Sequence, residues 1–416
     1  MDQSEKAFNN EQDLPRAKAT VLKLLAYCRA NDWAGYDPYD ALNSSLFALP
    51  LLNTKLTRLA LTQAMKRSPI NLRPWLLIPK TQNPKALALF LASLLKLSKL
   101  NLSKQDGEAT VLIDRLVALR SPNTAYWCWG YSFPWQTRTV LVPRGAPNLV
   151  CTIFVANALL DAYEQLGDTS CLNMAVSTGE YLLKELYYTE SNHVASFSYP
   201  LPGLKTKVHN ANFLAAALLY RLYSHTGDEK VVTPALAVAR YSVSKQKSDG
   251  SWNYGELPNQ NWIDNFHTGY NLNALRAIQR YSSGADFEPY LRRGFEFYRN
   301  RFFREDGAVR YFHNQTYPID IHCTAQSLLT LLEFQDLYPT NLGLVESIYR
   351  WAMKHMWNEA GFFYYRMLRT VKIRTSYMRW SQAWMLLALT TFLQEIKRAE
   401  KPAINIPANQ LLAVAP

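Results

Sequence analysis

Three histidines recur at equivalent positions of a repeated pattern, and their side chains are suited to acid–base chemistry. His209, His267 and His322 each begin an apolar segment (KVHNANFLAAALL, NFHTGYNLNAL and DIHCTAQSLLTLL), and they are 58 and 55 residues apart. An imidazole titrates near neutral pH, so it can take up or release a proton. In a ring of repeats, equal positions lie at the same height of the wall, which would bring these side chains to one central space. Capping or packing at a helix start is the competing interpretation.

Carboxylates gather in the same loops. Glu256 follows an aromatic segment, Asp264 lies three residues before His267, and Asp320 lies two residues before His322. Helix capping also accounts for both aspartates, whereas Glu256 has no evident capping role. A carboxylate beside an imidazole in a cleft of low dielectric gives a tunable proton donor and acceptor, and glycosidases use two carboxylates flanking the scissile bond. We therefore predict a catalytic group of Glu256, Asp264, His267, Asp320 and His322.

Aromatic residues make up 13% of the chain, and many stand in short segments before the apolar ones, such as WGYSFPWQ (129–136) and DGSWNYGE (249–256). The faces of such rings can stack on sugars, although core packing accounts for many of them. The predicted substrate-binding residues combine rings with nearby polar groups: Trp129, Trp135, Arg138, His209, Trp252, Tyr254, Tyr311 and Gln326.

The formal net charge of +12 is compatible with nucleic acid, an acidic membrane surface or an anionic substrate as partner. Lys and Arg are spread along the chain without a nucleic-acid-binding signature, so we predict no nucleic-acid partner. Convergence of the cations in equivalent loops would favour a saccharide that carries a carboxylate or phosphate. These cations are Arg138, Arg144, Lys205, Lys207, Arg374 and Arg379.

The elements that must position these residues follow from the repeat. Measured from Trp129, Phe197, Trp252, Tyr311 and Phe362, the aromatic segments recur with steps of 68, 55, 59 and 51 residues. A period of this length is typical of stacked helical hairpins. In LGDTS (166–170), TGDEK (226–230) and SSGADF (282–287), Gly marks the end of one helix and Asp the cap of the next. The pattern predicts helices over 14–30, 44–66, 84–98, 107–120, 148–166, 169–188, 209–225, 229–247, 265–282, 286–302, 321–336, 341–357 and 376–397.

These helices make six antiparallel hairpins and one extra helix, and no segment has the periodicity of a sizeable sheet. We therefore predict an all-α fold, an (α/α)6 toroid in a single domain over residues 13–398. Residues 1–12 are predicted to be a disordered tail and residues 399–416 a C-terminal tail. Five less polar helices would form the inner wall, and the loops before them the mouth of a cavity. They are the ones predicted over 148–166, 209–225, 265–282, 321–336 and 376–397.

Several observations bear on compartment and cofactors. The five cysteines form an odd set without a CxxC motif, and the N-terminal segment lacks the pattern of a signal peptide. No apolar run is long enough to span a membrane, so we predict a cytoplasmic protein without an integral membrane segment. The sequence has no GxxxxGK[ST], GxGxxG, HExxH or GxSxG motif, and the histidines lack the spacing of a metal site. We predict neither a cofactor nor a metal.

Six segments together resemble a bacterial family of six-hairpin, glycosidase-like proteins found in exopolysaccharide and capsule biosynthesis. They are GYDPYDALNS (35–44), WGYSFPWQ (129–136), DGSWNYGE (249–256), WIDNFHTGYNL (262–272), YPIDIHCTAQS (317–327) and YMRWSQAWM (377–385). The resemblance spans roughly residues 15–400 and implies an (α/α)6 toroid and a role in surface polysaccharide. As partners we predict a saccharide or polysaccharide and an association with the polysaccharide assembly machinery. The resemblance brings no established reaction. Some members carry a porphyrin-pathway dehydratase label, but that enzyme class is a β/α barrel with a Schiff-base lysine, which does not fit this sequence.

Two hypotheses of different class follow. The first is a carbohydrate-active enzyme. Its carboxylates favour glycoside hydrolysis, whereas the histidines are also compatible with sugar epimerisation. Arg138 and His209 could serve a polysaccharide lyase. The second is a non-catalytic saccharide-binding or assembly protein that uses the same aromatic cavity. A prenyl-lipid binder is a third possibility, suggested by one segment similar to the repeats of squalene cyclases, KQKSDGSWNYGE (245–256). It would need an apolar cavity and is disfavoured by the acidic and histidine residues.

Overall fold

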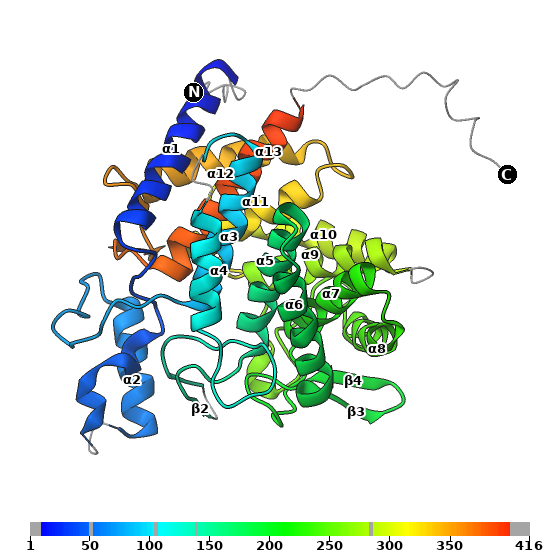
Figure 1. Cartoon of the computed structure of the whole chain (residues 1–416). Coiled ribbons are helices and arrows are strands. Elements are labelled where there is room, and N and C mark those ends of the chain that lie inside the picture. The colour runs from blue at the N-terminus through cyan, green and yellow to red at the C-terminus, as the bar shows by residue number, and fades with distance from the viewer. Residues whose placement is uncertain (1–9, 50–52, 104–106, 138–139, 283–285, 400–416) are drawn as a thin grey trace, which may run out of the picture.

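The computed structural model describes residues 10–49, 53–103, 107–137, 140–282 and 286–399. Six inner helices form a closed ring in which each contacts the next and the last contacts the first. They are α3 (Pro84–Lys99), α5 (Leu149–Leu166), α7 (His209–Thr226), α9 (Asn265–Tyr281), α11 (Ile321–Glu333) and α13 (Trp384–Ala399). The predicted (α/α)6 toroid is therefore confirmed (Figure 1).

Outer helices cover the ring. Five of them contact the inner helix that precedes them in the chain: α4 (Glu108–Ala118), α6 (Thr169–Tyr181), α8 (Val232–Val243), α10 (Glu288–Phe302) and α12 (Asn341–Met356). The sixth outer helix is α1 (Asn10–Ala30), which contacts α13. The two ends of the described chain thus make one hairpin, and this pairing closes the ring.

Two helix ends have the Gly and Asp caps that the sequence predicted. Gly167 and Gly227 adopt left-handed backbone angles (φ 74° and 67°) that end α5 and α7. Asp168 and Asp228 then accept backbone hydrogen bonds two residues on, which starts the next outer element. The third such turn, at 282–287, falls largely outside the described residues.

One predicted helix differs. Where 44–66 was expected, the described residues form two short 3-10 turns, Asp40–Asn43 and Ser45–Ala48, followed by α2 (Lys55–Arg67). Ser44 has an extended backbone (φ −62°, ψ 131°), and its hydroxyl accepts from the backbone N–H of Leu46, so the chain starts a new turn at this residue. This segment lies beside the ring instead of within it (Figure 1).

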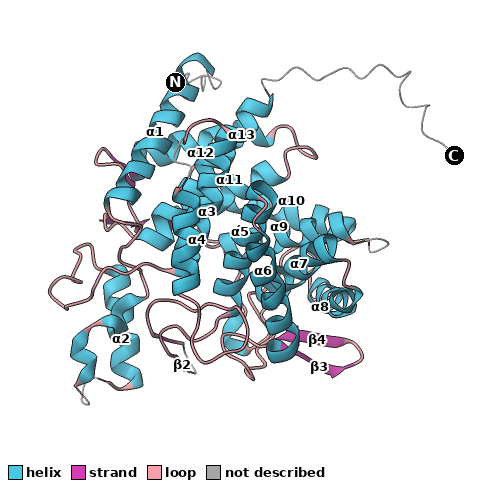
Figure 2. Ribbon diagram, in the orientation of Figure 1, coloured by secondary structure: helices cyan, strands magenta, loops and turns pink. Residues whose placement is uncertain are grey.

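The strands of the described chain are short and belong to the loops around the ring (Figure 2). Antiparallel pairs join β1 (Trp135–Gln136) with β2 (Leu141–Val142), β3 (Tyr187–Ser191) with β4 (Val194–Phe197), and β6 (Trp357–Asn358) with β7 (Phe362–Phe363). A three-stranded sheet has the order β5 (Ile319–Asp320), β8 (Arg366–Met367), β9 (Lys372–Ile373). The aromatic segments are thus short strands and loops, as the sequence predicted.

The helix α5 is long and apolar enough by composition to cross a membrane, and among the described residues it alone meets that test. In the structure it is an inner helix of the ring, with 61% of its residues buried. Burial among the neighbouring inner helices accounts for its composition.

Candidate active site

A cavity of about 540 Å³ opens at the end of the ring where the inner helices begin. Each of the six inner segments contributes the second residue after its N-cap to the wall. These residues are Lys85, Val150, Asn210, Phe266, His322 and Arg379, the last from the π-helical turn Met378–Ala383 that leads into α13. The rest of the wall comes from α9, from the π-helical turn, from the aromatic loops and from the segment between α1 and α3. These residues are His267, Tyr270, Trp380, Tyr131, Phe133, Trp135, Tyr199, Tyr254, Trp262, Asp264, Tyr311, Phe312, Tyr39, Gln63 and Lys66.

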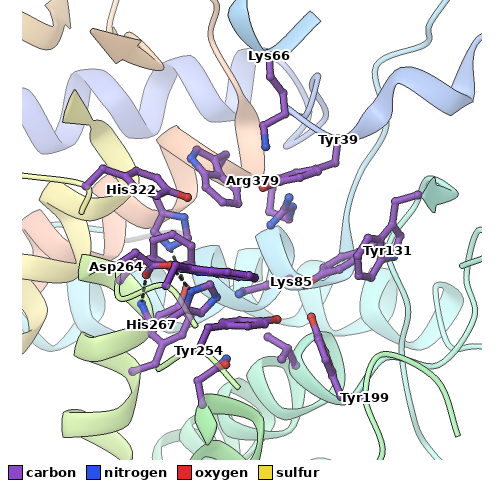
Figure 3. Close-up of a pocket in the computed structure, with 18 of the residues that line it drawn as sticks. Tyr39, Lys66, Lys85, Tyr131, Tyr199, Tyr254, Asp264, His267, His322 and Arg379 are labelled. Carbon is purple, nitrogen blue, oxygen red and sulfur yellow. Dashed lines mark hydrogen bonds and ion pairs between the residues drawn. The ribbon is translucent and has the colours of Figure 1, made fainter. Parts of the chain in front are cut away.

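Asp264 and His267 form a hydrogen-bonded dyad in this wall (Figure 3). Asp264 caps α9 by accepting the backbone N–H of His267 at 2.9 Å, and its other oxygen lies 2.7 Å from His267 Nδ1. Trp262 Nε1 donates to the same oxygen at 3.1 Å. The His267 side chain keeps 21% of its surface exposed, and its Nε2 forms no hydrogen bond with a described residue. The dyad therefore presents an oriented imidazole nitrogen to the cavity.

His322 and Tyr270 form a second pair, with 2.8 Å between His322 Nε2 and the Tyr270 hydroxyl. The His322 ring lies between Phe266 and Trp384, with ring centroids 4.7 Å away on each side. Burial lowers the pKa of His322 well below its ordinary value, and the cations of Lys85 and Arg379 act in the same direction. His322 is therefore a neutral imidazole that can share a proton with the Tyr270 hydroxyl.

Lys85 projects into the cavity from the first turn of α3 (Figure 3). Its Nζ lies 4.0 Å from the Phe154 ring centroid, 5.2 Å from Trp384 and 5.4 Å from Tyr270. The amino group has no hydrogen bond or ion pair with any residue that the structure describes. Burial, with Arg379 nearby, lowers the pKa of Lys85 well below its ordinary value. A buried amine without a carboxylate partner is well suited to meet negative charge on a ligand.

Arg379 is held in place by Asp37, with two contacts of 2.6 and 2.8 Å. The neighbouring Asp40 accepts from Arg73 Nε at 2.7 Å, and Arg73 Nη2 donates to the backbone oxygen of Asp37. All four side chains are buried. The motif GYDPYDALNS (35–44) thus supplies two carboxylates that anchor the cavity arginine and the loop after α2.

The structure separates the predicted catalytic residues into two groups. Asp264, His267 and His322 line the cavity, whereas Glu256 and Asp320 do not. Asp320 is buried and saturated: it accepts from Arg366, from Trp380 Nε1 and from the backbone N–H of His322. Asp320 therefore caps α11 and holds Arg366 and Trp380 in place from behind the cavity wall.

Neither Glu256 nor His209 lines the cavity. The Tyr241 hydroxyl donates to Glu256 at 2.5 Å, and Lys245 Nζ lies 3.8 Å from the same carboxylate. His209 Nδ1 lies 3.4 Å from the Ser242 hydroxyl of α8, so its ring packs toward the outer helix. The repeat predicted that all three histidines would face one central space. In the structure His267 and His322 line the cavity, whereas His209 does not.

We expect His209 to make stability depend on pH. Burial lowers the pKa of His209 to about 4 from 6.5. Between these values the unfolded chain binds a proton that the folded protein does not, so stability falls as pH falls, by about 1.4 kcal/mol per pH unit. Urea unfolding at pH 7 and pH 5 should show this loss in the wild type. The His209→Gln variant should have a lower free energy of unfolding than the wild type at pH 7. The difference between the two proteins should be smaller at pH 5. Parallel pH profiles for the two proteins would contradict the assignment.

The predicted substrate-binding residues also divide. Trp135, Tyr254 and Tyr311 line the cavity. Trp129 and Trp252 are core residues whose ring N–H groups donate to the backbone oxygens of Leu116 and Ser242. Arg138 lies outside the described residues. Among the other predicted cations within the described chain, Arg379 lines the cavity, and Arg144, Lys205, Lys207 and Arg374 do not.

Gln326 lines a second cavity of about 410 Å³ toward the other end of the inner helices. That cavity also contains Lys96 of α3, Asp161 of α5 and Glu395 of α13. Tyr270 belongs to the walls of both cavities. The floor of the first cavity is thus a layer of aromatic rings around Lys85.

Sequence reasoning missed Lys85, Tyr270, Tyr131 and Tyr199 as site residues. A signal for Lys85 existed, because a lysine directly after the Asn-Pro start of an otherwise apolar helix is unusual for a core position. The tyrosines had no such signal, since their role depends on which face of the helix or loop meets the cavity. In the described residues no three His, Cys, Asp or Glu side chains are grouped as metal ligands.

No protein-family model matches the sequence, and no curated protein matches it significantly. Solved structures do match. A cellobiose 2-epimerase from Bacillus thermoamylovorans aligns with TM-score 0.59 and 12% identity, over 76% of this chain and 90% of the epimerase. A family 76 glycoside hydrolase α-mannanase from Bacteroides thetaiotaomicron aligns with TM-score 0.57 and 13% identity, over 76% of this chain and 87% of the mannanase. A D-mannose isomerase aligns with TM-score 0.56 and 11% identity, over 75% of this chain and 86% of the isomerase. At such identities the comparisons establish the fold, which is that of the six-hairpin glycosidase-like proteins.

Proposed function

We propose that this protein is a carbohydrate-processing enzyme that moves a proton at the carbon next to a sugar carbonyl, as a sugar epimerase or an aldose–ketose isomerase. The observation that carries the proposal is the Asp264–His267 dyad, which presents an oriented, accessible imidazole to an aromatic cavity. The fold is compatible with this choice, since proteins that share it are named as a cellobiose 2-epimerase and a D-mannose isomerase, as well as an α-mannanase.

Glycoside hydrolysis, the activity that the sequence favoured, fits the cavity less well. Glycosidases of the usual kind need two carboxylates across the scissile bond. Among the described residues that line the cavity, Asp264 is the single carboxylate, and it is already engaged by His267 and Trp262. Glu256 and Asp320, the other candidates, lie outside the wall. We therefore prefer proton transfer to hydrolysis.

The reaction uses an open-chain sugar. His267 Nε2 removes the proton from C2, and the electrons of that C–H bond form a C1=C2 double bond while negative charge moves to the carbonyl oxygen. Lys85, close to the His322–Tyr270 pair, donates a hydrogen bond to this oxygen. Delivery of a proton to the opposite face of C2 restores the C1 carbonyl and gives the epimer, after which exchange with water returns the proton acceptor and the proton donor to their starting states. For the isomer, the proton returns to C1 while the O2 hydroxyl proton passes to O1, so that the carbonyl forms at C2. Tyr270 with His322 is the second proton donor, and no further reactant is needed.

The saccharide is proposed to carry an acidic group. Lys66, Lys85 and Arg379 line the cavity, against Asp264 as the single carboxylate of the described wall. Because Asp37 already neutralises Arg379 and Lys85 is assigned to the carbonyl oxygen, Lys66 is the cation of the described wall that is available to a carboxylate or phosphate. From the motif resemblance we extend the proposal to bacterial surface-polysaccharide metabolism in the cytoplasm, in association with the assembly machinery.

Hydrogen exchange tests the proposed chemistry directly. The purified protein would be incubated in D2O with glucose, mannose, cellobiose, glucuronate and glucose 6-phosphate, and the products followed by NMR. Deuterium at C2 of an epimer or at C1 of a ketose is the expected result, with acidic sugars preferred. Release of new reducing ends from an oligosaccharide without exchange would show hydrolysis instead. Saccharide binding without either product would favour the non-catalytic assembly role.

A further inference from the structure

The segment 53–80, which consists of α2 and the loop after it, differs from the rest of the surface in its apolar side chains. We call it the arm. Leu56, Trp75, Leu77 and Ile70 are 78%, 72%, 63% and 59% exposed, and they are the four most exposed large hydrophobic side chains of the described residues. Single exposed apolar residues are normal, but four of them within 28 residues make this segment a candidate interaction surface.

The charge of the arm is entirely basic. It contains Lys55, Arg58, Lys66, Arg67, Arg73 and Lys80 and no Asp or Glu. Arg73 is neutralised by Asp40, whereas the other five form no ion pair with a residue that the structure describes. Neighbouring parts of the sequence do not balance this positive charge, since no acidic residue occurs between Asp40 and Asp106.

The loop of the arm is built to keep its apolar side chains outside. Arg73 is buried and donates to Asp40, to the backbone of Asp37 and to the Tyr377 hydroxyl. Ile78 is buried in a small core with Ala41 and Met65. These two anchors hold the turn from both sides.

Trp75 and Leu77, between the anchors, protrude. Leu77 has φ 52°, a left-handed conformation that is costly for a branched side chain. A strained backbone that exposes an apolar residue indicates a selected function more than a packing accident.

We propose that the arm docks on the surface of an anionic lipid bilayer. Trp, Leu and Ile enter the boundary between headgroups and acyl chains, while Lys and Arg pair with anionic headgroups, and the arm offers both without a repelling carboxylate. A nucleic acid would satisfy the cations but leave the apolar side chains in water. The arm projects beside the ring (Figure 1), so docking does not require the toroid to open.

Docking would also orient the candidate active site. Gln63 and Lys66 of the same helix α2 line the mouth of the cavity. The cavity would then lie next to the bilayer, where a saccharide attached to a lipid or handled by membrane machinery is presented. The docking inference itself rests on the arm alone and holds whether or not the proposed reaction is correct.

Vesicle co-sedimentation of the full chain tests the inference. Vesicles of phosphatidylcholine would be compared with vesicles that also contain phosphatidylglycerol, at low and high salt. The wild type should pellet with the anionic vesicles, and less at high salt. Trp75→Ser with Leu77→Asn should weaken binding about tenfold. Asn is chosen because it tolerates the left-handed conformation. Lys55→Gln and Arg67→Gln should weaken binding about fivefold each.

Leu166→Ser is the matched control, because Leu166 is half-exposed at the end of α5, outside the arm. This variant should bind vesicles like the wild type, and all variants should melt at the wild-type temperature. Equal pelleting of wild type and arm variants, salt-insensitive pelleting on both vesicle types, or no pelleting would overturn the proposal. Self-association in sedimentation velocity that the arm variants abolish, without vesicle binding, would instead identify a protein interface.

Discussion

His267→Gln is expected to lower kcat/KM for epimerisation or isomerisation about 1,000-fold, because general acid–base groups contribute about 10² to 10⁴ to such rates. Glutamine keeps a polar side chain near Asp264 but cannot accept the C2 proton. The Asp264 cap on α9 depends on the backbone N–H of His267, so the helix start survives the substitution. The loss should therefore appear mainly in kcat, with substrate binding and the melting temperature little changed.

Glu256→Gln is the control for this prediction. Its carboxylate was an equally strong candidate from the sequence, yet the structure pairs it with Tyr241 outside the cavity. Activity near that of the wild type is expected. If Glu256→Gln abolished turnover while His267→Gln remained active, the assignment of the active site to this cavity would be wrong.

Lys85→Met is expected to have opposite effects on activity and stability. Loss of the hydrogen-bond donor at the developing oxyanion should lower kcat about 100-fold. Methionine fills a similar volume in the aromatic cage without a buried amine, so the free energy of unfolding should rise by about 1–3 kcal/mol at pH 7.

The stability gain has a defined pH dependence. Because the pKa of Lys85 is lowered in the folded protein, the unfolded chain binds the extra proton below pH 10.5, and the folded state is penalised there. The gain from Lys85→Met should therefore shrink as pH rises toward 10.5. Chemical unfolding at pH 7 and pH 10 measures this change.

Lys96→Met provides a matched control on the same helix. Lys96 is also a lysine whose pKa burial lowers, but it lines the second cavity and donates to Gln394. Its replacement should raise stability without a large loss of activity. Equal activity losses in the two variants would show that Lys85 acts through the helix and not at the reacting sugar.

The sequence by itself determined the hairpins. Helix ends are fixed by local chemistry, such as Gly167 in the left-handed region and Asp168 as the next cap, so they can be read from a few neighbouring residues. The period of the aromatic segments then indicates repeated hairpins, and stacking of such hairpins is needed to bury their apolar faces. Both the toroid and the loops at its mouth followed from this reasoning.

The inner wall was predicted less completely. Five inner helices were recognised by their low polarity, but α3 was not assigned to the wall, although it carries Lys85. The partner of α13 is α1, at the other end of the chain, and this pairing is a long-range contact without a local signal. Arg379 was noted as one cation among several, and its distinction, a place in the cavity wall fixed by pairing with Asp37, is a tertiary feature.

The direction of each side chain was decided by the tertiary structure. His209, His322 and His267 are the first, second and third residues after the caps of their helices, so similar positions in the repeat are not equal positions on the helix. Each residue turns the side chain by about 100° around the helix axis. A shift of one residue therefore sends His209 toward the outer helix, while Asn210 takes the place in the wall that His322 occupies on α11. Repeat spacing sets the height of a residue in the ring, and helical phase decides which side chains meet.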